Sequence, residues 1–172
     1  ARLPAQARAC QGNHGPCALL GARCMARIMA ENLPKGDEPF AIDVVGNRLT
    51  LLADGPGRLE ALLALIASAR RSLRILYYIF KDDESGARVR DAILDACARG
   101  VEVTILIDGF GSQDVADSFF QPLVESRCRF CRFQPRWGRR YLLRNHQKLA
   151  LADEERLIGG GFNISNDYFG TV

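Results

Sequence analysis

Residues 144–163 hold the side chains best suited to chemistry and read RNHQKLALADEERLIGGGFN. If residues 148–152 form a strand, side chains alternate across its two faces, so His146 and Lys148 point to the same side. An imidazole at a phosphorus centre can attack it, giving a phosphohistidine, or can protonate a leaving alkoxide. An ammonium group beside it would stabilise charge on the phosphoryl oxygens. Because this chemistry needs no metal, we expect neither a metal ion nor a cofactor.

The residues after this pair complete an anion-binding pattern. The acidic turn at 153–155 and the apolar run at 156–158 predict a hairpin. Three glycines, 159–161, permit unusual backbone angles or the close approach of an anionic ligand, and Asn163 supplies an amide. Taken alone, a histidine and a lysine in a strand are also ordinary, because short motifs carry a large false-positive risk.

Six residues of the full string define a pattern with fixed spacing: His146, Lys148, Asp153, Gly160, Gly161 and Asn163. With its spacing, it resembles the HKD signature of the phospholipase D superfamily, and residues 164–169 resemble the segment after the first HKD motif of bacterial cardiolipin synthases. The resemblance implies that the histidine is the nucleophile or acid/base and that the lysine and asparagine bind phosphate, with the two glycines allowing close approach. It also implies that the aspartate supports the histidine without reacting itself.

The chain before this string predicts alternating strands and helices. Expected strands are 41–45, 48–52, 72–80, 101–107 and 128–133, and expected helices are 58–69, 84–99 and 114–126. Gly46-Asn47 predicts a tight turn between the first two strands. The strand-helix-strand order predicts parallel strands with right-handed crossovers. The resemblance covers about residues 42–170 and implies a phospholipase D-like α/β fold: a mixed sheet flanked by helices in an α-β-α sandwich, forming a single HKD half.

Composition separates an N-terminal extension, residues 1–39, from one phospholipase D-like domain, residues 40–172. With 172 residues, 48% of them hydrophobic, the chain can bury a core. A possible helix at 18–30 is too short and too charged to span a bilayer, and the extension lacks the apolar core of a signal peptide. The net charge is only +3, but the arginines within 136–144 could meet anionic head groups, nucleic acid or only water.

Six cysteines raise the question of disulfides or zinc. Cys128 and Cys131 form a C-x-x-C, but strand alternation would send them to opposite faces, and no second pair with zinc-finger spacing follows. We therefore expect buried free thiols here. Three N-terminal cysteines recur every seven residues from Cys10, but with only His14 nearby they do not predict a metal site.

The chain holds one HKD set, whereas members of the superfamily use two, one histidine attacking and the other protonating the leaving group. The second histidine, His14, is not followed two residues later by lysine. The sequence also stops at Val172, soon after Asn163, as if truncated at its C-terminal end. We expect either the N-terminal half of a two-motif enzyme or a homodimer that pairs two single sets across a two-fold axis. The first fits better, because the body of the chain resembles the first half of a two-motif lipid enzyme.

The resemblance implies a phosphatidyltransferase of the cardiolipin synthase type, working through a phosphohistidine intermediate. Expected partners are a phosphatidylglycerol-like phospholipid, a membrane surface and the second HKD set. The expected location is peripheral, on the cytoplasmic face of the bacterial inner membrane. One alternative is a phospholipase D or a metal-independent phosphodiesterase or nuclease acting as a homodimer; on nucleic acid its binding would depend strongly on salt. Another is an inactive fragment that binds phosphate or lipid.

Overall fold

The computed structural model describes residues 40–134 and 145–170. The expected helix at 18–30, the N-terminal cysteines with His14, and the arginines within 136–144 lie outside the described residues. The chain divides into two compact units, residues 1–51 and 52–172, and each is described by itself.

The first unit contains an antiparallel hairpin of β1 (Ala41–Val44) and β2 (Asn47–Thr50). Its turn residues are Val45 and Gly46, with φ of 48° and 80°. A type I′ turn needs positive φ at both central residues, which glycine adopts readily and a β-branched valine does not. The hairpin is confirmed, and its turn lies one residue earlier than the sequence predicts.

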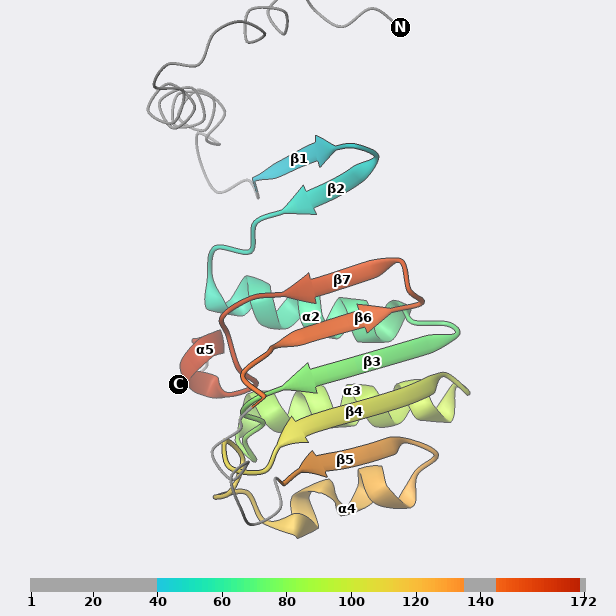
Figure 1. Ribbon diagram of the computed structural model, residues 1–172, viewed down its shortest axis with the longest axis vertical. Coiled ribbons are helices and arrows are strands. Elements are labelled where there is room, and N and C mark those ends of the chain that lie inside the picture. Colours follow the sequence, from blue (N-terminus) through green and yellow to red (C-terminus); the bar gives the residue numbers. More distant parts are fainter. Residues whose placement is uncertain (1–39, 135–144, 171–172) are drawn as a thin grey trace, which may run out of the picture. The chain divides into compact units, whose positions relative to one another are not determined.

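The second unit is built on a mixed sheet that has the order β5-β4-β3-β6-β7 among the described residues (Figure 1). Its strands are β3 (Ser72–Tyr77), β4 (Glu102–Asp108), β5 (Arg129–Phe133), β6 (Leu149–Ala152) and β7 (Arg156–Gly159). The first three run parallel, whereas β6 is antiparallel to both β3 and β7. The start of β6 therefore lies beside the end of β3.

Helices α2 (Gly55–Ser68), α3 (Glu84–Ala98) and α4 (Asp117–Glu125) flank this sheet, and the short α5 (Asn166–Phe169) follows the last strand (Figure 1). Along β3, buried residues alternate with more exposed ones, which is typical of a sheet covered on one face. The mixed sheet flanked by helices is thus confirmed.

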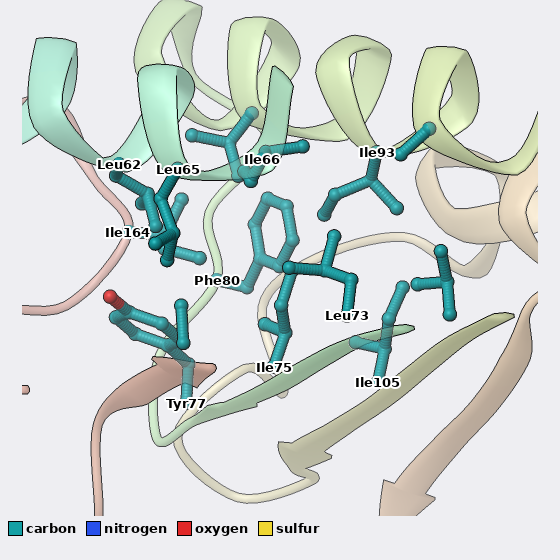
Figure 2. Close-up of a cluster of buried hydrophobic side chains, with 14 of the residues drawn as sticks. Leu62, Leu65, Ile66, Leu73, Ile75, Tyr77, Phe80, Ile93, Ile105 and Ile164 are labelled. Carbon is teal, nitrogen blue, oxygen red and sulfur yellow. The ribbon is translucent and has the colours of Figure 1, made fainter. Parts of the chain in front are cut away.

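A hydrophobic core fills the space between the helices and the sheet (Figure 2). Helix α2 contributes Leu62 and Ile66, strand β3 contributes Leu73 and Ile75, and Phe80 follows from the segment after β3; all are at most 2% exposed. A spacing of three or four residues in a helix and of two in a strand places each set on one face. This packing fixes β3, whose far end leads to the candidate site.

A disulfide joins Cys97, near the end of α3, to Cys128, just before β5. Their Cα atoms are 6.4 Å apart, a separation that a disulfide spans. The expectation of a free thiol at Cys128 is therefore wrong, because its partner comes from a helix and not from the C-x-x-C pair. Cys131 is a free thiol as expected, but it is exposed and not buried.

Candidate active site

His146 and Lys148 lie in the segment that enters β6, which begins one residue later than predicted. His146 is exposed, and its ring centroid is 4.6 Å from that of Tyr78, with 60° between the ring planes. The Nζ atom of Lys148 is 5.3 Å from the centroid of the same Tyr78 ring. It also donates a 2.9 Å hydrogen bond to the His146 carbonyl oxygen. The structure thus brings the histidine and the lysine together around one aromatic ring.

Lys148 is 6% exposed, and desolvation by burial lowers the pKa of its amine. The contact with the Tyr78 ring and the bond to a carbonyl oxygen both favour the protonated form. A positive charge at this position is also less screened by water than one on the surface. An ammonium group here would therefore hold a phosphoryl group close to the exposed imidazole.

Asn163 is held beside the chain that leaves β3, next to the same tyrosine. Its Oδ1 accepts a 3.1 Å hydrogen bond from the Ile79 amide. The backbone of Ile164 bonds to Ile79 and to Lys81, at 3.1 and 3.0 Å, and so lays residues 163–164 alongside that segment. Because Oδ1 is engaged with the backbone, Nδ2 is the end of the amide able to donate to a phosphate oxygen.

The three consecutive glycines are not explained by unusual backbone angles, because none of Gly159, Gly160 and Gly161 has a positive φ. The amide of Gly160 donates to the Lys148 carbonyl at 3.3 Å, and a Cβ there would lie 3.3 Å from the Phe162 ring. A Cβ at Gly161 would meet no described atom within 4 Å. Open space at Gly161 is compatible with the close approach of a ligand, which stays a prediction.

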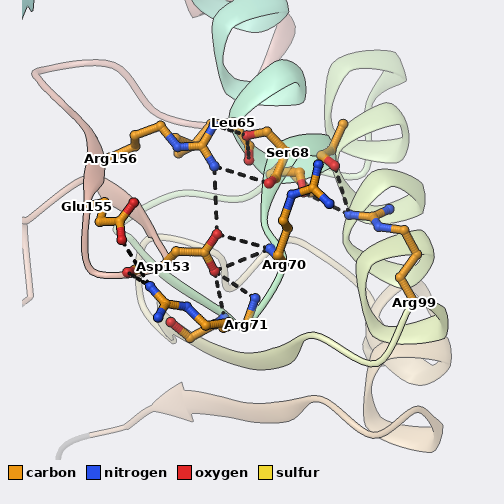
Figure 3. Close-up of polar contacts among 11 residues, drawn as sticks. Leu65, Ser68, Arg70, Arg71, Arg99, Asp153, Glu155 and Arg156 are labelled. Carbon is orange, nitrogen blue, oxygen red and sulfur yellow. Dashed lines mark hydrogen bonds and ion pairs between the residues drawn. The ribbon is translucent and has the colours of Figure 1, made fainter.

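Asp153 lies at the opposite end of β6 from Lys148. Its carboxylate accepts hydrogen bonds of 2.7 to 3.2 Å from the backbone amides of residues 70–72, in the turn between α2 and β3 (Figure 3). Arg156 adds an ion pair at 3.7 Å. These amide donors, that of Ser72 first, lower the pKa of Asp153 to about 2.

The expected support of the histidine by Asp153 therefore does not take the form of a direct contact. A strand rises roughly 3.3 Å per residue, so the five steps from Lys148 to Asp153 span about 16 Å. The aspartate instead anchors the turn that begins β3, and Arg71 reinforces it by bonding to the Asp153 carbonyl oxygen at 3.2 Å and to Glu155 at 3.0 Å. Its contribution to the site is indirect, through the pairing of β6 with β3.

A cavity of about 710 Å³ opens at this same end of the sheet, lined by the end of α2, Arg99, Asp153 and Arg156. Arg99 donates to the carbonyl oxygens of Ile66 and Ala67 at 3.0 and 3.2 Å. Arginine here adds a donor to carbonyl groups in the last turn of the helix. The cavity is thus lined by other residues than the cluster around His146.

Two residues near His146 have no role predicted from the sequence. Tyr78 belongs to an aromatic stretch that is typical of core, yet β3 ends at Tyr77 and the Tyr78 ring lies against the imidazole. Asp108, at the end of β4, accepts a 2.9 Å bond from the amide that directly precedes His146 in the chain. Their positions in the sequence were the available signal, because both lie at the carboxyl ends of adjacent parallel strands, where α/β proteins form their sites.

Within the two described ranges, no group of three or more histidine, cysteine, aspartate or glutamate side chains is placed to hold a metal ion. Nor does any helix among those residues have the length and hydropathy needed to cross a membrane.

Known proteins resemble this chain in sequence. Residues 62–171 match the family model described as cardiolipin synthase, PLD-like domain. The chain is 36% identical over 124 residues to cardiolipin synthase 1 of Bacillus cereus, which covers 70% of this chain and 24% of that protein. It is 34% identical over 134 residues to the major cardiolipin synthase ClsA of Bacillus subtilis, which covers 76% of this chain and 28% of that protein. The chain thus spans about a quarter of the length of these curated relatives.

The fold is similar to that of NucT from Helicobacter pylori, with a TM-score of 0.57, 22% sequence identity and 77% of each chain covered. This likeness concerns the fold alone. The family model covers well over half of the chain and includes the whole HKD string. The chain therefore belongs to the phospholipase D superfamily, as a cardiolipin synthase-like member.

Proposed function

We propose that this chain carries one catalytic set of a phosphatidyltransferase of the cardiolipin synthase type. The observation that supports this most is that the exposed His146 imidazole and the buried Lys148 amine both lie against the Tyr78 ring. A ring nitrogen of His146 attacks the phosphodiester of one phospholipid, forming a P–N bond while the P–O bond to the head-group alcohol breaks. The hydroxyl of a second phospholipid then attacks the phosphorus, which releases the imidazole and completes the transfer.

The other site residues follow from this scheme. Lys148 and the Nδ2 group of Asn163 bind the phosphoryl oxygens, whose negative charge grows in the transition state. The open space at Gly161, next to Gly160, admits the phosphate. The leaving alcohol needs a proton from a second acid, because His146 is occupied as the nucleophile. We place this second HKD set in another part of a longer protein, since the relatives extend far beyond the matched segment; a second copy of this chain is the alternative source.

The proposed substrate is a phosphatidylglycerol-like lipid in a membrane surface to which the protein binds peripherally. The cytoplasmic face of the membrane stays a prediction. The Cys97–Cys128 disulfide weighs against that face, because disulfides persist in oxidising compartments and are rare in the reducing cytosol. Thiol labelling in rapidly quenched cells, before and after reduction, tests it: labelling of Cys97 and Cys128 before reduction would favour the cytoplasmic face.

The test of the proposed function combines turnover with oligomeric mass. Phosphatidylglycerol vesicles are incubated with the purified chain, with His146→Gln and with Gln147→Ala as a matched control at an exposed neighbour. Light scattering gives the mass of each. A dimer whose turnover is lost in His146→Gln means that two copies complete the site, and a monomer without turnover means that the second set lies elsewhere. Turnover that survives His146→Gln would refute the proposal.

A metal-independent phosphodiesterase acting on nucleic acid is the second candidate. It is favoured by the single HKD set in this chain, which suits a homodimer. It predicts cleavage of DNA in the presence of EDTA and affinity that falls steeply with salt. An inactive fragment, the third candidate, predicts phosphate or lipid binding without turnover of either substrate.

A further inference from the structure

Asp108 is a buried acidic residue for which the proposed reaction has no direct use. It ends β4 and is 1% exposed. Its Oδ1 accepts hydrogen bonds from the amides of Phe110 and Gly111, at 2.9 and 3.1 Å. These two bonds close a tight loop after the strand, which is a common use of aspartate.

The second carboxylate oxygen makes a contact that closing the loop does not require. Oδ2 of Asp108 accepts a 2.9 Å hydrogen bond from the backbone amide of Asn145, 37 residues further along the chain. Asn145 directly precedes His146, and its own Oδ1 accepts from the Gln147 amide at 3.4 Å. The backbone on both sides of His146 is therefore tied, directly or through Asn145, to one buried carboxylate.

The loop that Asp108 closes also contacts the backbone of Tyr78, whose ring lies against the imidazole. Ser112 Oγ donates to the Tyr78 carbonyl at 3.4 Å and accepts from the Phe80 amide at 3.1 Å. A Cβ added at Gly111 would overlap the Tyr78 carbonyl, so the loop and the end of β3 are in close backbone contact. Asp108 is thus linked to His146 through the Asn145 backbone and to Tyr78 through the loop that it closes.

We propose that Asp108 is a positioning residue that sets the His146 imidazole against Tyr78 and so orients it for attack on phosphorus. The catalytic consequence rests on the function proposed above, whereas the positioning rests on the contacts alone. A carboxylate is required because three amide donors converge on it. In Asp108→Asn, Oδ1 still accepts from the loop, but Nδ2 faces the Asn145 N–H, donor against donor. The tether is then lost while the side-chain volume is kept.

Histidine NMR tests the positioning without reference to turnover. The chain contains two histidines, so histidine labelled with ¹³C gives two ring signals, and His14→Ala assigns that of His146. The Tyr78 ring shifts this signal in the wild type, and Tyr78→Leu gives its position without the ring. Asp108→Asn is expected to move it most of the way to the Tyr78→Leu position. Asp114→Asn, which removes an exposed carboxylate next to the same loop, is the control and should leave it in place.

Turnover then tests the catalytic consequence. A misplaced nucleophile costs about 100-fold in rate, so Asp108→Asn should lose kcat by about that factor, while KM changes little because the lysine and asparagine are untouched. An unchanged His146 signal in Asp108→Asn overturns the positioning role, whatever the turnover. A wild type that shows the ring shift but turns over no lipid refutes the proposed function and leaves the positioning role supported by the NMR.

A second measurement covers the case in which Asp108→Asn fails to fold. In the wild-type chain, the Asn145 amide donates to a buried carboxylate and should exchange its hydrogen far more slowly than an unstructured amide. Slow exchange at Asn145 supports the tether. Exchange at the unstructured rate overturns it.

Discussion

Reduction of the Cys97–Cys128 disulfide should lower the stability of this fold more than the loss of any surface ion pair. The bond closes a loop with a sequence separation of 31 residues, which contains all of β4 and α4. In the chain-entropy account, a loop of this length restricts the unfolded state enough to contribute about 4 kcal/mol at 25 °C. For a chain of this size, that corresponds to a fall in Tm of roughly 8 to 16 °C.

Urea unfolding followed by circular dichroism measures this effect in the oxidised chain, the reduced chain and a variant with both Cys97→Ala and Cys128→Ala. Cys131→Ala is the matched control and should behave as the wild type, because that thiol is free and exposed. The m-value should rise as the midpoint falls, since an unfolded chain without the cross-link exposes more surface. A double variant with the wild-type midpoint would refute the reasoning, because the magnitude comes from the loop length alone.

Three further predictions concern the site and its supports. Burial lowers the pKa of the Lys148 amine below the usual 10.5. The affinity of the chain for diethyl phosphate, measured by NMR titration, should therefore fall as pH rises through this lowered pKa. Lys148→Met should abolish this pH dependence. The pKa of Asp153 is about 2 against a usual 3.8, so its carboxylate stabilises the fold above about pH 4 and loses this effect as pH falls through about 2. Acid unfolding of Asp153→Asn should lack this dependence, and curves of equal shape would contradict the anchoring role. Gly161→Ala should keep the wild-type Tm, because its Cβ enters open space, and should reduce turnover by occupying the space proposed for phosphate. Gly86→Ala, whose Cβ overlaps the Lys81 carbonyl, should instead lower Tm. Full turnover in Gly161→Ala would mean that phosphate does not approach there.

The sequence predicts which residues gather at the candidate site better than it predicts the contacts that orient them. The spacing of the HKD string identifies His146 and Lys148, and the structure brings them together. The contact with Tyr78 depends on where β3 ends. Local pattern predicts one strand over 72–80, but the strand stops at Tyr77, and the next side chain lies against the imidazole. Residue types in an apolar run do not encode that end point.

The remaining differences involve partners far apart in the sequence. Asp153 binds the amides of residues 70–72, more than 80 positions away, and Cys97 pairs with Cys128 across 31 positions. The first contact depends on the pairing of β6 with β3, and the second on the pairing of β5 with β4. The sequence alone therefore assigns Asp153 to the support of His146, whereas the pairing of β6 with β3 places its carboxylate at the turn before β3.

The four residues between Lys148 and Asp153 are the whole of β6. One end of this strand carries the amine of the site, and the other holds the turn that starts β3. One residue inserted in β6 would force a choice: keeping the Asp153 bonds would displace Lys148 by about 3.3 Å and turn it to the opposite face, whereas keeping Lys148 would pull the aspartate from its amides. The spacing between the lysine and the aspartate of the motif thus sets the length of strand β6. A chain that keeps every residue type of the motif but changes that length would lose either the amine or the anchor.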